Sequence, residues 1–249
     1  FPEEGNEFLS QNGIDTQGLT RVAGKTFQYE AEYPADMQDR KTIRTDLNVF
    51  EHFRPAIPDS YKDTPIVFLG NIDPVLQIEV LDQVKGPKHV AADTMNYWIH
   101  GHRENLIKML GRIDTLILND SEARELTGES NLVAALRAIT AMGPSIVIMK
   151  KGEHGALLYQ DGDFFHVPAF PVEIVKDPTG AGDAFAGGVL GFIARCGKFD
   201  RRTWMEAMQH GTAVASFVVE EFGPAPLRQL DHDKIESRIA RLRAMVTLP

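Results

Sequence analysis

Short apolar runs, separated by segments of helical length, set the hydrophobic pattern through the middle of the chain. Runs of this kind, rich in β-branched residues, are typical of strands buried on both faces of a parallel sheet. The pattern predicts strands at residues 66–70, 89–92, 115–118 and 145–150, and helices at residues 74–84, 99–110, 120–126 and 132–142. Alternating strands and helices predict an α/β fold with three layers: an open, mostly parallel sheet with helices on both faces.

The two ends of the chain follow other patterns. An aromatic-rich alternation of period two predicts a strand at 26–33, and a weaker one predicts a strand at 42–50 after a turn around 36–41. These two strands would form a small sheet of their own. Beyond residue 150 the pattern predicts three short strands, at residues 156–159, 164–167 and 172–175, with Asp161-Gly162 as a hairpin turn between the first two. Helices then follow at residues 184–196, 203–221 and 234–245.

Composition narrows the class of protein. Hydrophobic residues make up 43% of the chain and charged residues 24%, as in ordinary globular domains. The net charge of −9 argues against nucleic-acid binding, although backbone N–H groups and a metal ion could still hold an anionic ligand. Cys196 is the single cysteine, which excludes a disulfide framework, and His100 and His102 lack a third zinc ligand at sensible spacing. We see no signal-peptide pattern or membrane-length apolar run and expect a cytoplasmic protein.

A glycine-rich turn is the most informative stretch of the sequence. Residues 177–188 read D-P-T-G-A-G-D-A-F-A-G-G and lie between a predicted strand and an apolar helix. Their N–H groups at the helix N-terminus would form an anion site, and Asp183 beside them could accept a proton from a substrate hydroxyl. The same residues could be only a tight turn and a helix cap. A dinucleotide fingerprint fits poorly because Phe185 stands where Gly or Ala is wanted, and a Walker loop lacks its Gly-Lys-Ser/Thr.

These twelve residues closely resemble the C-terminal signature of the ribokinase-like (PfkB) carbohydrate kinases, a family that includes adenosine kinases. The resemblance implies a ribokinase-like fold and an enzyme that uses Mg²⁺ and ATP to phosphorylate a hydroxyl of a sugar, cyclitol or nucleoside. It makes Asp183 the catalytic base and assigns the anion hole to Gly180, Ala181 and Gly182. Activation by a monovalent cation is left open.

The resemblance also extends to a possible metal site. Asn119 and Glu122, which follow the strand predicted at 115–118, resemble the family's N-x-x-E element, whose side chains help organise Mg²⁺ and phosphate largely through water. Taken alone, an Asn before a helix with an acid three residues later is more often a capping box. Beside the glycine-rich signature we favour the metal role.

Nucleotide-binding positions are implied at two further places. Lys150, Gly152 and Gly155 resemble the family's nucleotide loop, with Lys150 preferred as the phosphate-neutralising lysine, although lysines at a strand end are also a common solvated edge. Thr179 in the signature, together with His210 and Thr212 in a predicted helix that walls the adenine, completes the implied nucleotide site. The small residues of that helix would equally suit close helix packing. The substrate or phosphate contacts are implied at Asp93 and Asn96, in a D-x-N-type element.

We expect residues 1–249 to form a single kinase domain. The resemblance runs from residue 1 to about 224, and it begins late. We expect roughly the first 45 residues of a typical member to be absent, judged against the family pattern and the usual size of such a domain. Residues 24–50 would form a β lid that closes over the substrate, and relatives suggest a homodimer through this lid. Two rival functions remain: a non-catalytic nucleotide- or sugar-binding sensor that keeps the kinase fold, and a nicotinamide-dependent oxidoreductase.

Overall fold

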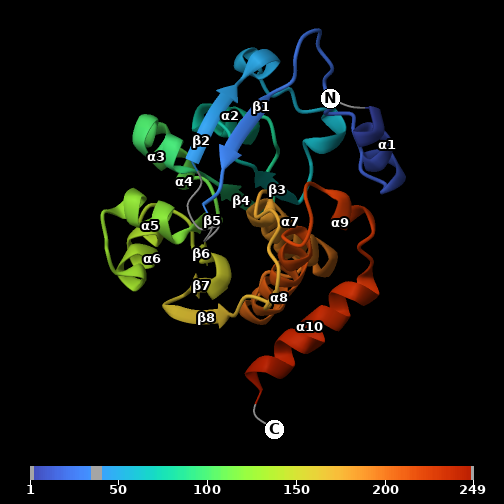
Figure 1. Ribbon diagram of the computed structural model, residues 1–249. Helices are drawn as coiled ribbons and strands as arrows, with labels where there is room; N and C mark the ends of the chain where they lie inside the picture. Colours follow the sequence, from blue (N-terminus) through green and yellow to red (C-terminus); the bar gives the residue numbers. More distant parts are fainter. Residues whose placement is uncertain (1–2, 35–40, 248–249) are drawn as a thin grey trace. The chain divides into compact units, whose positions relative to one another are not determined.

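The computed structural model describes residues 3–34 and 41–247, and the chain forms two compact units (Figure 1). The smaller unit comprises residues 1–64 and 79–85, and the larger unit comprises residues 65–78 and 86–249. Within the part of the chain that the structure describes, no helix has both the length and the apolar character needed to cross a membrane.

The larger unit is built on one six-stranded sheet, whose strands follow one another in chain order across the sheet. The first four strands are mutually parallel, and the last two continue the sheet as antiparallel strands. The tight turn before the last strand has positive φ at both Asp161 and Gly162, as a type I′ hairpin requires. The strands are β3 (Ile66–Leu69), β4 (His89–Asp93), β5 (Thr115–Asn119), β6 (Ile146–Lys150), β7 (Ala156–Gln160) and β8 (Asp163–Val167). The sheet therefore confirms the predicted mostly parallel α/β fold.

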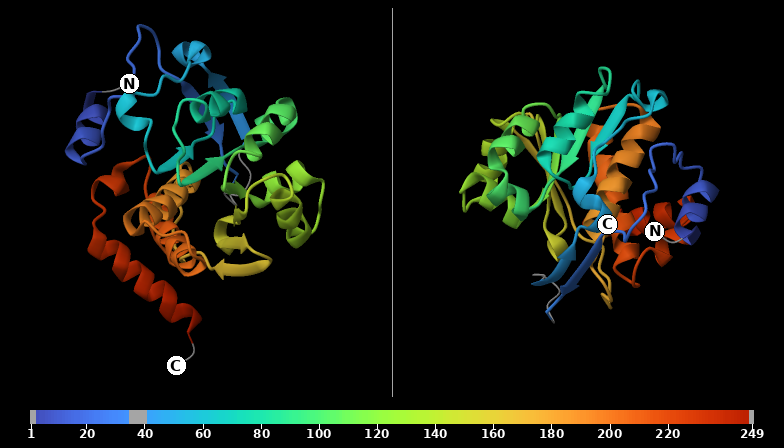
Figure 2. Two further views of the ribbon diagram at one scale, coloured as in Figure 1. Left: turned by 180° about the vertical axis from the view of Figure 1, so that it is seen from behind. Right: turned by 90° about the horizontal axis from the view of Figure 1, so that it is seen from above.

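Helices cover both faces of this sheet, with α5 and α6 on one face and α7 and α8 on the other (Figures 1 and 2). The helices that follow β3 are α2 (Pro74–Leu81), α3 (Asn96–Gly101), α4 (Arg103–Leu110), α5 (Asp120–Thr127), α6 (Leu132–Thr140), α7 (Ala181–Cys196), α8 (Arg201–Val218), α9 (Ala225–Arg228) and α10 (His232–Val246). Asp231 caps the last helix, because its side chain accepts a hydrogen bond from the Lys234 N–H in the first turn.

The core follows from the period-two alternation of the strands. Ala91, Ile117 and Ile148 are buried on the sheet face that α7 and α8 cover, where they join Val189 and Trp204 in one hydrophobic cluster. Residues two positions further along each strand share this face. For β4 and β6 these next residues are polar and stand at the carboxyl ends of the strands, so the core leads directly into the candidate site.

Two predictions for the larger unit are wrong. Residues 172–175 form no strand. Pro168 and Pro171 remove ladder donors just before them, and the following N–H group of Lys176 donates instead to the Val219 carbonyl at 2.8 Å. The helix predicted at 99–110 is two helices, α3 and α4, because the chain leaves helical geometry at His102 after the weak helix former Gly101.

The smaller unit contains helix α1 (Glu3–Gln11), two single-turn 3₁₀ segments (Asn48–His52 and Asp59–Tyr61) and an antiparallel pair of strands, β1 (Gln28–Glu32) and β2 (Lys41–Asp46). The second predicted strand is therefore too long. Asn48 has φ 52° and its side chain donates to the Thr26 carbonyl at 2.9 Å, which turns the chain into the 3₁₀ helix. Most of the turn predicted around 36–41 lies outside the described residues.

Candidate functional site

A row of polar residues ends the core face of the sheet. Asp93 closes β4, Asn119 closes β5 and Lys150 closes β6, and the register pairs Asn119 with Lys150 and Asp93 with Ile117. The carboxyl edge of an open α/β sheet is where such folds bind ligands. The structure thus brings three of the predicted site residues to one edge.

Lys150 and Asp93 interact closely at this edge. The Lys150 Nζ lies 3.8 Å from the Asp93 Oδ2, and the two side chains are only 19% and 7% exposed. Burial raises the pKa of the Asp93 carboxyl; the Lys150 ammonium opposes this rise, and the nearby Asp183 carboxylate adds to it. Asp93, Lys150 and Asp183 are therefore one electrostatic group.

The glycine-rich turn shapes the N-terminus of α7. Gly180 precedes the helix with φ 81°, a left-handed conformation that glycine adopts without steric cost. The Asp177 carboxylate accepts the Thr179 N–H at 2.9 Å and fixes the turn before it. Gly182 and Asp183 lie in the first helical turn, where N–H groups have no partner within the helix, and the Asp183 side chain is exposed.

Lys150 also approaches this turn. A Cβ placed on Gly182 would lie 3.1 Å from the Lys150 Nζ, so the ammonium group lies directly beside the backbone at the helix start. A lysine charge and a helix N-terminus both favour an anion. The charge of Lys150 and the N–H groups of the helix start therefore fit a phosphate group.

Asn119 and Glu122 form a complete capping box at the start of α5. The Asn119 side chain accepts the Glu122 N–H at 2.7 Å, and the Glu122 carboxylate accepts the Asn119 N–H at 2.8 Å. No group of three or more His, Cys, Asp or Glu side chains that could hold a metal occurs within residues 3–34 and 41–247. An amide and a carboxylate are suitable outer ligands for a Mg²⁺ that keeps its waters, so the metal role stays a prediction.

Asn96 is held by a neighbouring helix. Its Nδ2 donates to the Glu125 Oε1 at 3.2 Å, and the same carboxylate accepts the Ser121 hydroxyl and pairs with His100. The Asn96 amide therefore links α3 to α5, the helix capped by Asn119. A contact with substrate is untested and stays a prediction.

The loop after β6 contains the two predicted glycines in a short 3₁₀ turn (Gly152–His154) and the residue after it. A Cβ on Gly155 would lie 2.1 Å from the Val167 carbonyl oxygen, so the hairpin itself requires glycine there. Gly152 has φ 53° and open space around its Cβ position. Gly152 thus has the room that close approach of a nucleotide would need.

The predicted adenine wall is buried in α8. The His210 ring stacks on Phe192 of α7 with centroids 4.2 Å apart, and its Nε2 lies 3.6 Å from a Glu236 oxygen of α10. Burial lowers the pKa of His210. Thr212 is buried as well. Phe192 lies nine residues after Asp183, about 13 Å along the helix, so these contacts are made well away from the glycine-rich turn.

Gln77 is a site residue that sequence reasoning missed. Its side chain is 1% exposed, and its Nε2 donates to the carbonyls of Leu69, Gly70 and Asp93 at 3.3, 2.9 and 3.1 Å. It thereby ties together the carboxyl ends of β3 and β4. A single glutamine within the apolar run of α2 is the signal that could have found it.

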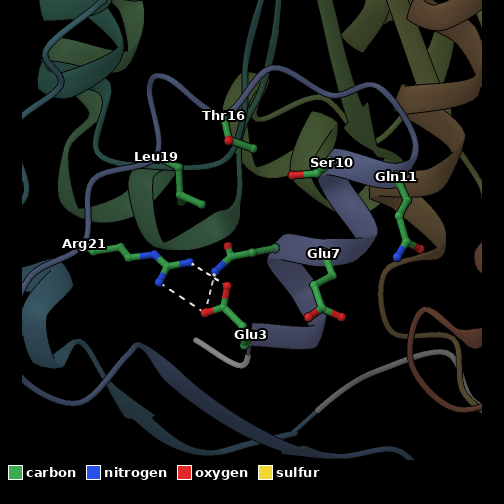
Figure 3. Close-up of a pocket in the computed structure, with 8 residues that line it drawn as sticks. Glu3, Glu7, Ser10, Gln11, Thr16, Leu19 and Arg21 are labelled. Atoms are coloured by element: carbon green, nitrogen blue, oxygen red, sulfur yellow. Dashed lines mark hydrogen bonds and ion pairs between the residues drawn. The ribbon is translucent and has the colours of Figure 1, made fainter.

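A separate cavity of about 450 Å³ lies in the smaller unit (Figure 3). Residues of α1 and of the chain that follows line it, and Glu3 and Arg21 form an ion pair across it at 3.1 Å. The predicted site residues all belong to the larger unit, and none of them lines this cavity.

Comparison with known proteins identifies the family and the fold. The family model described as pfkB family carbohydrate kinase matches residues 6–229. A cytidine kinase of Thermococcus kodakarensis is 31% identical, with 90% of this chain and 79% of the relative aligned, and a nucleoside kinase of Methanothermobacter thermautotrophicus is 27% identical, with 88% and 69% aligned. An E. coli protein described as a ribokinase II, solved with ATP and Mg²⁺, has the same fold with a TM-score of 0.77 at 23% identity, covering 96% of this chain and 79% of that one.

Proposed function

Because the chain belongs to the pfkB family of carbohydrate kinases and is a kinase of sugar-like or nucleoside substrates, we propose that its acceptor is a hydroxyl group of a nucleoside. Two relatives that align with most of the chain are named for nucleosides, which supports this choice. The Lys150 ammonium beside Gly182, in the helical turn that carries Asp183, is the observation that most directly supports a phosphoryl-transfer site.

Asp183 is the general base in this proposal. The acceptor oxygen attacks the γ-phosphorus of ATP, its proton passes to the Asp183 carboxylate, and the bond to the bridging oxygen breaks to release ADP. The backbone N–H groups of Gly180 and Gly182 would stabilise the charge that develops on the phosphoryl oxygens. The Ala181 N–H, which donates to the Pro178 carbonyl at 3.1 Å, would join them by exchanging that carbonyl for the phosphoryl group. The exposed position of Asp183 leaves its carboxylate accessible to an acceptor.

Most of the remaining predicted residues serve the nucleotide, and Asn96 would contact the substrate. Lys150, Gly152, Gly155 and Thr179 would bind the phosphates of ATP, and His210 and Thr212 would lie against the adenine. Asn119 and Glu122 would hold Mg²⁺ through its waters. The bound ion would neutralise charge on the phosphate oxygens. Added K⁺ in the same assay tests the open question of a monovalent cation.

A coupled ADP-release assay on the intact protein tests the function. We expect Mg·ATP turnover that depends on a nucleoside and is weaker with pentoses, hexoses or inositols. Asp183→Asn and Asp183→Ala should lower kcat by roughly 10²–10⁴-fold while ATP still raises the melting temperature. Unchanged kcat in both variants would refute the role of Asp183. ATP and nucleoside binding without any ADP release would favour the sensor.

The lid, the dimer and the location of the protein extend this proposal. Residues 24–50 would act as the lid of a single kinase domain that excludes water during transfer. The smaller unit exposes several large apolar side chains, among them Phe27, Phe50 and Phe53, which supports a homodimer through this part. Sedimentation analysis over a range of concentrations should show the dimer.

The proposal also places the protein in the cytoplasm, which cell fractionation tests.

A further inference from the structure

Lys150 does not extend from its strand into solvent. β4 and β6 flank β5, so their backbones are about 10 Å apart at the usual strand spacing. The Lys150 side chain reaches across the end of β5 to within 3.8 Å of the Asp93 carboxylate, and its Nζ also lies beside Gly182. A flexible lysine stem adopts one such path only when a partner fixes its end.

Asp93 is suited to be that partner because it is itself fixed. Its side chain is 7% exposed, and its backbone carbonyl accepts a hydrogen bond from the buried Gln77 amide at 3.1 Å. Gln77 also binds the carbonyl ends of β3, so the strand end that carries Asp93 is held from both sides. The Asp93 carboxylate therefore offers Lys150 a rigid anchor.

Stability alone does not explain a buried pair at this place. The desolvation of two buried charges costs about as much free energy as their attraction provides. Proteins in which apolar residues of similar volume replace such a pair are often as stable. The pair does lie beside the proposed base, because the Lys150 Nζ is next to Gly182, the residue that precedes Asp183. Asp183 belongs to the same electrostatic group, and without Asp93 it would be the remaining carboxylate of that group for Lys150 to pair with.

We propose that Asp93 is a positioning residue rather than a substrate ligand: it anchors the Lys150 ammonium at the N-terminus of α7 and keeps it from pairing with Asp183. The anchored charge then faces the phosphate that enters the turn, and the Asp183 carboxylate stays available to the acceptor hydroxyl. The inference rests on the proposed function, since it assigns a role within the same phosphoryl-transfer site.

A double-mutant cycle tests the proposal in the intact protein. Lys150→Met should lower kcat/KM for ATP by roughly 10²-fold, and Asp93→Asn by at least 10-fold, each with KM for the nucleoside nearly unchanged. If Asp93 acts through Lys150, the double variant Asp93→Asn/Lys150→Met should be no worse than Lys150→Met. Lys151→Met, a lysine one residue later on the chain, is the matched control and should retain wild-type rates.

Three outcomes would overturn the proposal. The two losses could multiply in the double variant, Asp93→Asn could raise KM for the nucleoside and leave kcat unchanged, or the wild type could show no nucleoside-dependent ADP release. Only the third also removes the proposed function. If Asp93→Asn alone fails to fold, the comparison of Lys150→Met with the double variant still shows whether Asp93 acts through Lys150. The double variant should fold because it buries no unpaired charge.

Discussion

Two adjacent glycines of α7 should respond to alanine substitution in opposite directions. A Cβ on Gly188 would lie 2.9 Å from the Gly211 Cα and 3.1 Å from the His210 carbonyl oxygen, both backbone atoms of α8. A Cβ on Gly187 would meet nothing within 4 Å. One residue therefore marks the contact between the two helices, and its neighbour faces away from that contact.

The magnitudes follow from these surroundings. Alanine in a helix interior is favoured over glycine by about 0.5–1 kcal/mol, so Gly187→Ala should stabilise the protein by that amount. Gly188→Ala gains the same preference but must push apart two backbones, and such overpacking costs about 1–3 kcal/mol. A net loss of about 1–2 kcal/mol is expected. At about 2–4 °C for each kcal/mol in a chain of this size, the two melting temperatures should differ clearly.

Thermal and urea unfolding, followed by far-UV circular dichroism on the two variants and the wild type, measure this difference. The wild type should lie between the variants. A Gly188→Ala protein as stable as Gly187→Ala would refute the close packing of α7 on α8. The small residues of α8 would then be better explained by the adenine wall than by helix packing.

Two further predictions concern pH and the anion hole. Burial lowers the pKa of His89. Below about pH 6.5 the unfolded chain therefore binds a proton at His89 that the folded protein excludes. The contribution of His89 to the free energy of unfolding should be fully present above that pH and should fall as the pH drops. Urea unfolding at pH 7.5 and 5.5 should show a larger loss for the wild type than for His89→Gln, and equal losses would contradict this. Gly182→Ala should push the Lys150 ammonium away from the turn and raise KM for ATP several-fold in steady-state kinetics without lowering thermal stability, whereas unchanged kinetics would argue against the contact.

Most of the sheet could be predicted because its strands are continuous apolar runs. β3 to β6 begin and end within a residue or so of the predicted ranges. The strand predicted at 172–175 failed because its apolar residues follow two prolines and the backbone next bonds to the end of α8, a partner more than forty residues away. Local pattern cannot reveal a partner at that distance.

The candidate site was predictable to the extent that strand ends could be located. Asp93, Asn119 and Lys150 each follow an apolar run, and parallel strands bring such positions to one edge. The pairing of Asp93 with Lys150 was not predictable. It depends on the order of three strands and on the reach of one lysine, which are set by tertiary structure. The capping box of Asn119 and Glu122 was the alternative already visible in the sequence.

The chain carries a net charge of −9, yet its candidate site is arranged for an anion. Lys150 and the N-terminal turn of α7 give this edge positive character, and both act only over short distances. A buried carboxylate beside a lysine lowers the net charge that the lysine offers to an anion. Because Asp93 lies at the strand end and Gly182 at the helix start, the ammonium between them can neutralise one and still face a phosphate held at the other. In the proposed site, a fixed lysine at this edge thus takes the place of a broad basic surface.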